Sequence, residues 1–348
     1  MLGNKKMHIA LIYNVRHVKA GLGQQAQEEA EFDEPETIAA IHDAIVANGY
    51  ECTDIETNEE AYGKLKKLKK TIDLVFNFSE GLHGEMREAQ MPAILEMLGI
   101  AYTHSGALAQ AIALDKSLTK KVWLYHGLPT PKYVIIGPND KPYVEGLTFP
   151  VIVKPNSEGS SKGVFNDNLV TTPDTLVAKI RATRAACGNG VIVEEYMPGR
   201  EFTVTVMGNP GVGKGVYILP IVEINFDVYP KDMGKFESFE AKWFLESTLT
   251  SPHDIYICPA QLARSVQTMI ETMCIKAFLA LGCRDIARID LRMDARGKPH
   301  LLEINTIPGM IGDPNVVTYY PAAARAAGWD YNRIVGQIIT HARERLEI

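Results

Sequence analysis

The chain has 348 residues, of which 46% are hydrophobic and 22% charged, and its formal net charge is −6 at pH 7. This length predicts two or three domains with substantial cores. The negative net charge gives no electrostatic sign of a protein that binds nucleic acid or an anionic membrane. The five cysteines form no CxxC pair, and no apolar run is long enough for a signal-peptide core or a membrane span. These features predict a cytoplasmic globular protein with reduced thiols.

The first hundred residues alternate between strand and helix patterns, and each helix pattern is followed by a glycine. This alternation predicts a small parallel α/β domain over residues 1–106. The expected elements, in chain order, are strand His8–Tyr13, helix Pro35–Asn48, strands Glu51–Ile55 and Asp73–Asn77, and helix Glu88–Leu98.

A second α/β region follows, and the patterns after it are those of antiparallel strands. We assign residues 107–195 to a central domain and 196–348 to a C-terminal domain. The expected elements are helix Leu114–His126, strand Pro150–Lys154, helix Asp174–Ala186, strands Gly190–Glu195, Phe202–Met207 and Gly215–Ile224, helix Pro259–Leu281, a hairpin within Ala287–Met310, and helix Tyr331–Arg345.

The stretch Ala287–Met310 carries the strongest functional signal. Charged and apolar residues alternate along two runs that flank residues 295–298, a pattern typical of a half-buried β-hairpin. With a four-residue loop, Asp290 lies opposite Glu303 and Arg288 opposite Asn305. On the other face, this register pairs Leu291 with Leu302 and Ile289 with Ile304.

The charged face of this hairpin predicts a metal site. Two carboxylates directly across a sheet repel each other, and a cation between them removes the repulsion. Carboxylate and amide oxygens are ligands that suit Mg²⁺. A solvated polar face is the alternative, but it does not explain why the charged face leads straight into Thr306–Met310. We therefore predict that Asp290, Glu303 and Asn305 bind metal.

The glycine- and serine-rich stretch Ser157–Gly163 directly follows a predicted strand. Small residues allow backbone N–H groups to approach phosphates, and Lys154 at the strand end can neutralise negative charge. An ordinary surface turn is the alternative for such a cluster. Lys116 and the carboxylate hairpin favour the phosphate site. Downstream, Glu201 leaves a strand at a domain junction, where it could accept hydrogen bonds from ribose, although a charged linker is the alternative.

Two other glycine motifs lack the context of a nucleotide site. Gly208–Gly215 nearly matches a P-loop, but it ends in Gly where a hydroxyl is needed and joins two strand-like runs, so we expect a hairpin turn. Gly21–Ala26 resembles a dinucleotide fingerprint, yet the next helix pattern begins only near Pro35. A nicotinamide-dependent dehydrogenase is therefore a weak alternative. A non-catalytic nucleotide-binding module is disfavoured because all three metal-ligand positions carry oxygen donors.

Seven segments of the chain, in their order along the sequence, resemble the ATP-grasp superfamily and, most closely, the D-alanine–D-alanine ligases. The resemblance runs from about Asp73 to the C-terminus. It implies an α/β ATP-grasp fold with an N-terminal Rossmann-like domain and two further domains that hold ATP between them. The resembling segments are LEMLGIAYTHSGALAQAIALDKSLTKKVW, GLPTPKY, FPVIVKPNSEGSSKGV, VIVEEYMPGREFTVTVMG, FEAKWFLES, IARIDLRMD and LLEINTIPGM.

The resemblance also implies roles for single residues. The hairpin residues Asp290, Glu303 and Asn305 would bind two Mg²⁺ ions, with Mn²⁺ as an alternative. Arg288 and the Gly309 N–H would stabilise a tetrahedral intermediate, and Ser160 would contact the substrate. The residues implied to bind ATP are Lys116, Lys154, Ser161, Glu194, Glu195, Met197, Glu201 and Lys242.

The reaction implied by the resemblance is phosphorylation of a carboxylate to an acyl phosphate, followed by attack of an amine to form an amide. Phosphoryl transfer of this kind depends on positioning and charge neutralisation, which lysines and two Mg²⁺ ions supply. The expected partners are a small-molecule carboxylate and an amine, without nucleic acid or membrane. A homodimer is left open.

The substrate-facing positions depart from the family pattern. Glu80-Gly81 stands where the family has His-Gly, Trp243 replaces a tyrosine, and Pro314 falls at the position of a serine that grips a carboxylate. We therefore expect substrates other than two D-alanines, with a true D-alanine–D-alanine ligase as the alternative. The N-terminal motif whose glutamate holds the first ammonium group in the family is absent, and Asp33, Glu34 or Glu36 would have to substitute for it.

Overall fold

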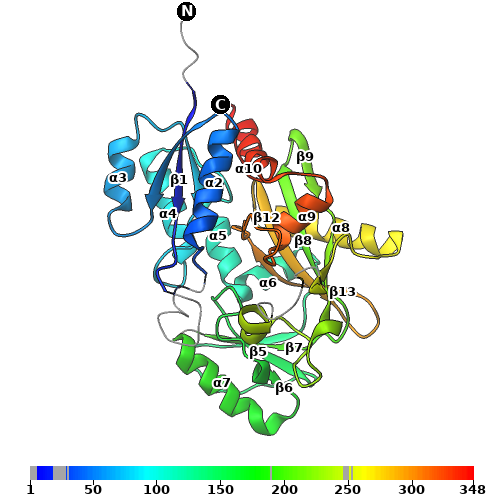
Figure 1. Ribbon diagram of the computed structural model, residues 1–348. Coiled ribbons are helices and arrows are strands. Elements are labelled where there is room, and N and C mark those ends of the chain that lie inside the picture. Colours follow the sequence, from blue (N-terminus) through cyan, green and yellow to red (C-terminus); the bar gives the residue numbers. More distant parts are fainter. Residues whose placement is uncertain (1–5, 19–28, 30, 189, 246–250, 252–253) are drawn as a thin grey trace, which may run out of the picture.

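The computed structural model describes residues 6–18, 29, 31–188, 190–245, 251 and 254–348. Within these residues the chain forms three sheets flanked by helices (Figure 1). The mixed α/β architecture expected from the sequence is confirmed. The predicted domain boundaries at 106/107 and 195/196 stay predictions. None of the helices described is long and apolar enough to cross a membrane.

The N-terminal sheet is parallel, with β1 (His8–Tyr13) between β2 (Glu51–Glu56) and β3 (Leu74–Phe78). The predicted alternation of strand and helix is confirmed here. All five residues of β3 are buried, as expected of a parallel strand covered on both faces. The helices that follow the three strands are α2 (Pro35–Ala47), α3 (Ala61–Leu68) and α4 (Arg87–Leu98). The lysine-rich α3 carries only two buried residues, which explains why its pattern was not predicted.

The second sheet is antiparallel, in the order β4-β7-β5-β6, and contains four strands. The helix expected over Leu114–His126 is α6, which begins at Lys116 because the Asp115 side chain accepts a hydrogen bond from the Leu118 N–H, and a helix that was not predicted, α5, precedes it. The elements of this region are α5 (Ala107–Leu114), α6 (Lys116–Tyr125), β4 (Tyr133–Ile136), β5 (Val151–Pro155), the 3₁₀ turn Asn166–Asn168, β6 (Leu169–Val170), α7 (Pro173–Cys187) and β7 (Val191–Glu195).

The third sheet has six strands, with β8 at its centre and buried along its whole length. Its elements are β8 (Glu201–Asn209), β9 (Val212–Ile218), β10 (Val222–Ile224), β11 (Tyr256–Ile257), β12 (Ile286–Met293) and β13 (Pro299–Asn305). The accompanying helices are the 3₁₀ turn Phe226–Val228, the π-helical turn Ala241–Leu245, α8 (Arg264–Ala280), α9 (Tyr319–Ala326) and α10 (Tyr331–Leu346).

Two sequence-based expectations change in this sheet. The strand predicted over Gly215–Ile224 is two strands, β9 and β10, and the break contains Pro220, which has no N–H for a ladder. The helix predicted from Pro259 begins only at Arg264. The glycine motif at residues 208–215 is the expected hairpin, which joins β8 to β9. The dinucleotide-like motif at 21–26 lies outside the described residues.

The β12–β13 hairpin has the predicted register at its functional end. Asp290 pairs with Glu303, and the pairs Arg288–Asn305 and Ile289–Ile304 are also present. The predicted pairing of Leu291 with Leu302 is wrong. A β-bulge next to Asp290 pairs Leu291 with Leu301 instead, which leaves Leu302 free to line the cavity beside Glu303.

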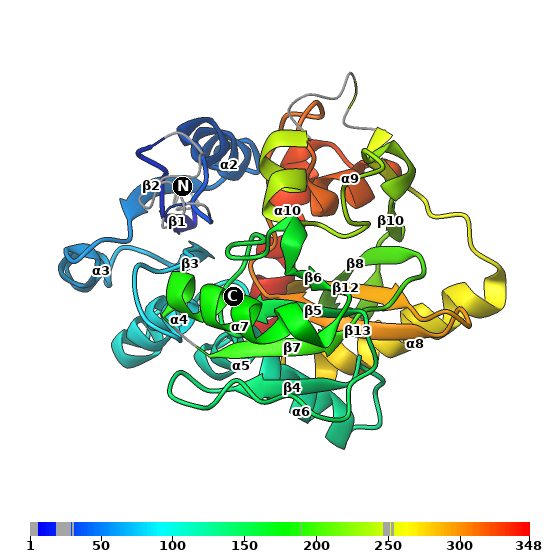
Figure 2. The same cartoon turned by 90° about the horizontal axis from the view of Figure 1, so that it is seen from below.

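One hydrophobic core joins the two ends of the chain. It contains Ile9 and Phe76 from the N-terminal sheet together with Tyr320 and Ile338 from the last two helices. Helix α10 packs along α2, so the C-terminus lies beside the N-terminal sheet (Figure 1). Full burial of each such side chain contributes roughly 1.5–3 kcal/mol to folding. The shared core holds the N-terminal sheet against the six-stranded sheet. The four-stranded sheet lies across from β12 and β13 (Figure 2).

Candidate active site

Two adjoining cavities open where the three sheets meet. The intersheet compartment, of about 790 Å³, lies between strands β5 and β7 on one side and β8, β12 and β13 on the other. The N-terminal compartment, of about 1300 Å³, extends from there to the segments that follow β1 and β3. The residues common to both compartments are Lys116, Glu158, Gly159, Ser161, Glu237 and Glu303.

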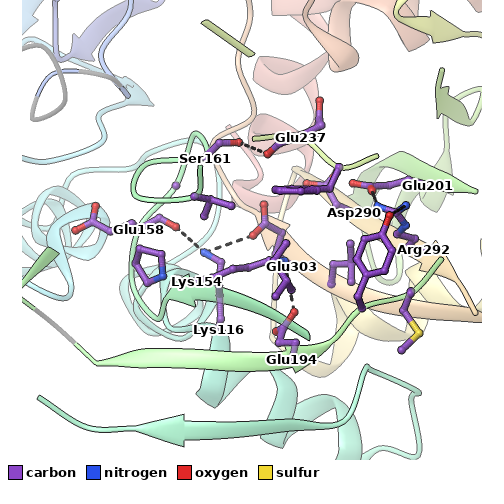
Figure 3. A pocket seen from close by; sticks show the side chains of 18 of the residues that line it. Lys116, Lys154, Glu158, Ser161, Glu194, Glu201, Glu237, Asp290, Arg292 and Glu303 are labelled. Carbon is purple, nitrogen blue, oxygen red and sulfur yellow. Dashed lines mark hydrogen bonds and ion pairs between the residues drawn. The ribbon is translucent and has the colours of Figure 1, made fainter. Parts of the chain in front are cut away.

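Lys116 stands at the passage between the compartments. It is the first residue of α6, and its Nζ donates to the Glu158 carbonyl at 2.5 Å and lies 3.4 Å from Glu303 Oε2 (Figure 3). Lys154, on β5, lies 3.4 Å from Glu194 Oε2. Burial alone lowers the pKa of Lys154, but Glu194 and Glu303 raise it above its ordinary value. Lys116 and Lys154, two of the three lysines predicted to bind ATP, thus face one cavity.

Lys120, which the sequence analysis missed, organises this corner of the site. It is fully buried, and its Nζ lies 3.0 Å from Glu194 Oε1 and 2.8 Å from Thr130 Oγ1. The signal in the sequence was its spacing, because it follows Lys116 by four residues on the same helix face. Burial raises the pKa of Glu194, but Lys120 and Lys154 outweigh burial and lower it. Glu194 lines the intersheet compartment with its carboxylate held by two lysines, and its predicted role in binding ATP stays a prediction.

We expect Lys120→Met to destabilise the protein by about 3 kcal/mol, because removal of one partner leaves a buried carboxylate undercompensated. The neighbouring Lys121 is exposed, so Lys121→Met is the matched control. Chemical denaturation of both variants gives the free energies of unfolding. Adding Glu194→Gln to the Lys120 variant should recover part of the loss. Equal stability of the two single variants would contradict a stabilising role for the Lys120–Glu194 pair.

The outer end of the intersheet compartment is built around Arg292. Its Nη1 lies 2.8 Å from Glu201 Oε2, and its Nη2 donates to the Tyr196 hydroxyl at 2.8 Å. Burial raises the pKa of Glu201 to about 7 even though Arg292 opposes the shift. Glu201 lines the cavity, and its predicted contact with ribose stays a prediction. Arg292 was missed as a site residue although it lies two residues beyond Asp290 on the same strand face.

The predicted metal ligands lie together on the cavity face of β12 and β13. Arg288 donates to both oxygens of Asp290, at 3.2 and 2.9 Å, and Asn305 Nδ2 donates to Asp290 Oδ2 at 3.2 Å. Burial alone raises the pKa of Glu303, but Lys116, Lys154 and Arg288 lower it to about 2. Two carboxylates and an amide oxygen form a hard donor set that fits Mg²⁺. The structure thus brings the three residues together, and their metal-binding role stays a prediction.

The glycine-rich loop is held against the N-terminal sheet. The Gly159 N–H donates to Glu31 Oε1 at 2.8 Å, and Arg87 Nη1 donates to the Ser157 carbonyl at 3.1 Å. A side chain at Gly159 would place its Cβ 2.3 Å from Glu31 Oε1, so the Glu31 side chain would have to move away from the loop. On its other side the loop is held by Ser161, whose Oγ donates to the Glu237 carbonyl at 2.8 Å. Residues of this loop therefore line both compartments.

The other predicted residues divide between the compartments. Met197 and Glu195 line the intersheet compartment, where Glu195 Oε1 accepts a hydrogen bond from the Thr148 N–H at 2.8 Å. Ser160, Arg288, Asn305 and Gly309 line the N-terminal compartment. Lys242, predicted to bind ATP, also lines the N-terminal compartment, and its Nζ lies 3.4 Å from Ser160 Oγ.

Only some of the residues that differ from the family pattern, or that were expected to substitute for it, line the N-terminal compartment. Asp33, Glu80 and Trp243 line the N-terminal compartment. Glu34 instead pairs with Arg16 at 2.7 Å, and Glu36 is exposed on α2.

Pro314 is exposed and does not line the cavity. Thr306 and Thr318 line the compartment, and their hydroxyls are buried. Among the described residues neither hydroxyl has a hydrogen-bond partner.

Comparison with known proteins gives one consistent result. Residues 122–340 match the family model described as D-ala D-ala ligase C-terminus. The chain is 34% identical over 311 residues to a D-alanine–D-alanine ligase of Desulforudis audaxviator, covering 88% of this chain and 92% of that one. An uncharacterized protein of Sinorhizobium fredii is 32% identical over 319 residues, 88% of each chain.

Solved structures agree with these sequence matches. A D-alanine–D-alanine ligase from Bacillus anthracis, crystallised as a complex with ATP, superposes with a TM-score of 0.71 and is 25% identical in sequence. The match covers 98% of this chain and 99% of that one. The similarity therefore extends over all three sheets.

Proposed function

We propose a specific reaction for this chain, which belongs to the D-alanine–D-alanine ligase family and is an ATP-dependent ligase. It phosphorylates a small carboxylate with ATP and joins the resulting acyl phosphate to an amine, forming an amide. ATP occupies the intersheet compartment, and the carboxylate and amine occupy the N-terminal compartment. We further propose that the reaction takes place in the cytoplasm.

The observation that carries this proposal is the passage between the two compartments. Lys116, Glu303 and the loop at Gly159 border both cavities, so a phosphate placed there faces nucleotide on one side and substrate on the other. Lysine side chains at this point neutralise phosphate charge, and backbone N–H groups of a glycine-rich loop can approach phosphate oxygens. Transfer of a phosphoryl group between two bound ligands requires that both ligands lie next to that group.

Residues of the chain supply four functions in this reaction. Lys116 and Lys154 hold the phosphates. Arg288 stabilises negative charge that develops on the reacting carbonyl, as preorganised donors do in other acyl-transfer sites. Asp290, Glu303 and Asn305 hold Mg²⁺, which neutralises phosphate charge when bound. The loop roof keeps water from an acyl phosphate.

An ADP-release screen tests the proposal. Amino acids, hydroxy acids and small amines are supplied singly and in pairs with ATP and Mg²⁺, and amide products are identified by mass spectrometry. We expect ADP formation to depend on a carboxylate–amine pair. ADP formation that no pair stimulates would contradict ligation. Efficient turnover with D-alanine alone would identify a true D-alanine–D-alanine ligase.

The glycine-rich loop and the polar stretch 225–242 should close over bound ATP. They already contact each other through Ser161 and Glu237, at a carbonyl-to-hydroxyl distance of 2.8 Å. Hydrogen–deuterium exchange with and without a nonhydrolysable ATP analogue and Mg²⁺ is the measurement. We expect slower exchange in both segments with nucleotide. The exposed loop around Lys141, a residue that lines neither cavity, is the internal control. Unchanged exchange in both segments would rule out closure.

A further inference from the structure

A second group of metal-ligating side chains lies in the N-terminal sheet. It consists of His42 on α2 and of Cys52 and Asp54 on β2, the next element along the chain. One donor atom from each of the three side chains lies within 4.8 Å of the other two. None of these residues lines either compartment of the candidate active site. The group is therefore separate from the proposed Mg²⁺ ligands on β12 and β13.

The packing of α2 on the sheet brings the three side chains together. Cys52 and Asp54 are two residues apart on a strand, so their side chains leave the same face of the sheet. Cys52 packs against the core that contains Ile38 and Ile41, which identifies this face as the one covered by α2 (Figure 2). His42 reaches the face from the helix, and its Nδ1 lies 2.8 Å from Asp54 Oδ1. The Cys52 thiol donates to the same oxygen at 3.7 Å.

The donor set favours zinc. Thiolate sulfur, imidazole nitrogen and carboxylate oxygen are the ligand types that Zn²⁺ takes in proteins, whereas Mg²⁺ takes oxygen ligands. Zinc bonds of about 2.0–2.3 Å in a tetrahedron place the ligand atoms about 3.5 Å apart. The separations of 2.8 and 3.7 Å at Asp54 Oδ1 lie on either side of that value, so small side-chain rotations accommodate the ion. Three protein ligands leave the fourth position of the tetrahedron to water.

The surroundings of the group admit a cation. The side chains of His42 and Asp54 are 32% and 39% exposed, so an ion from solution can reach them. Within the described part of the chain, no lysine or arginine forms an ion pair with Asp54, and its only charged neighbour at ion-pair distance is His42. A half-exposed carboxylate that is bonded to an imidazole and a thiol can therefore bind a metal without first breaking a salt bridge to a lysine or arginine.

We propose that His42, Cys52 and Asp54 bind a zinc ion, which joins helix α2 to strand β2. Zinc forms one bond to each side chain, the S–H bond of Cys52 breaks, and the thiol proton passes to solvent, with no change in oxidation state. Strand β2 is the edge strand of the sheet, so the ion fastens this edge to the helix that covers it. The site does not depend on the ligase reaction, and its occupancy is measured without substrates.

Cobalt tests for the sulfur ligand. Co²⁺ takes the same nitrogen and sulfur ligands as Zn²⁺, and a Co²⁺–thiolate bond adds a near-ultraviolet charge-transfer band that oxygen and nitrogen ligands do not give. The full-length protein, reduced and freed of metal by a chelator, is titrated with Co²⁺. We expect the band in the wild type and its loss in Cys52→Ser. Cys187→Ser, which alters another half-buried free cysteine, is the matched control and should keep the band.

Zinc affinity tests the other two ligands. It is measured by competition with a chromophoric chelator in the same full-length protein. His42→Gln and Asp54→Asn should each weaken zinc binding at least about tenfold, because loss of even an outer-shell partner of a metal costs that much. Asp43→Asn, which alters the neighbouring exposed acid on α2, is the control and should bind zinc as the wild type does. Zinc that binds to the oxygen ligands Asp290 and Glu303 is common to all these variants and cancels in the comparison.

Stability and spectra together decide the outcome. Thermal unfolding in the presence of chelator shows that each variant is folded, and zinc should raise the unfolding midpoint of the wild type more than that of His42→Gln, since a ligand of the folded state stabilises it. A wild-type Co²⁺ spectrum without the charge-transfer band, or a band that persists in Cys52→Ser, would overturn the inference. Equal zinc affinity of the wild type, His42→Gln and Asp54→Asn would also overturn it and leave the group as a hydrogen-bonded surface cluster.

Discussion

Replacing Glu303 with glutamine is expected to lower ADP formation at least about a hundredfold, because a lost carboxylate weakens a cation that contributes several kcal/mol to transition-state charge neutralisation. Glu303 is ionised, since three nearby cations lower its pKa to about 2 despite burial. It pairs across the hairpin with Asp290, so glutamine keeps the shape of the site and removes one charge. Steady-state ADP formation at ordinary Mg²⁺ concentration is the measurement.

Two controls separate loss of metal from loss of fold. Glu51→Gln removes an exposed carboxylate on β2, far from the cavity, and should leave turnover unchanged. Raising the Mg²⁺ concentration should restore part of the activity of Glu303→Gln, because weakened binding is overcome by mass action. Near-wild-type turnover of Glu303→Gln at ordinary Mg²⁺ would refute the assignment of Glu303 as a metal ligand.

The hairpin illustrates what sequence pattern can and cannot predict. Alternating charges placed Asp290 opposite Glu303 correctly, because a strand exposes every second residue to the same face. The same rule failed for Leu302, since a β-bulge adds one residue to a strand and periodicity does not reveal it. The bulge has a consequence for the site, because it brings Leu302 to the cavity wall.

Residues that act through tertiary contacts were the ones that pattern analysis missed. Lys120 and Arg292 looked like ordinary helix and strand charges until the fold placed Glu194 and Glu201 against them. Glu31 reaches the Gly159 amide across 128 residues of sequence, a distance over which no local pattern carries information. The sequence pointed to Asp33 and Glu80 as residues near the substrate, whereas Glu31 and Glu88 were found on the same cavity wall only in the structure.

Replacing Arg288 with methionine should lower amide formation by about 10²–10³-fold, the usual effect of removing one donor that stabilises a developing oxyanion. Arg288 donates to both oxygens of Asp290 and lines the N-terminal compartment beside Gly309. Methionine keeps much of the apolar stem and removes the charge. Arg296→Gln is the matched control, because Arg296 is exposed in the turn of the same hairpin.

The step at which Arg288 acts can be identified with isotopes. If it stabilises the tetrahedral intermediate, acyl phosphate still forms in the Arg288 variant and returns to ATP. Positional exchange of labelled oxygen within ATP, measured with the best carboxylate substrate and no amine, should then persist while amide formation falls. If Arg288 chiefly orients Asp290, its loss should suppress exchange and amide formation together, and higher Mg²⁺ should restore both. The two roles thus predict opposite exchange results in one variant, because charge on the reacting carbonyl develops only after phosphoryl transfer is complete.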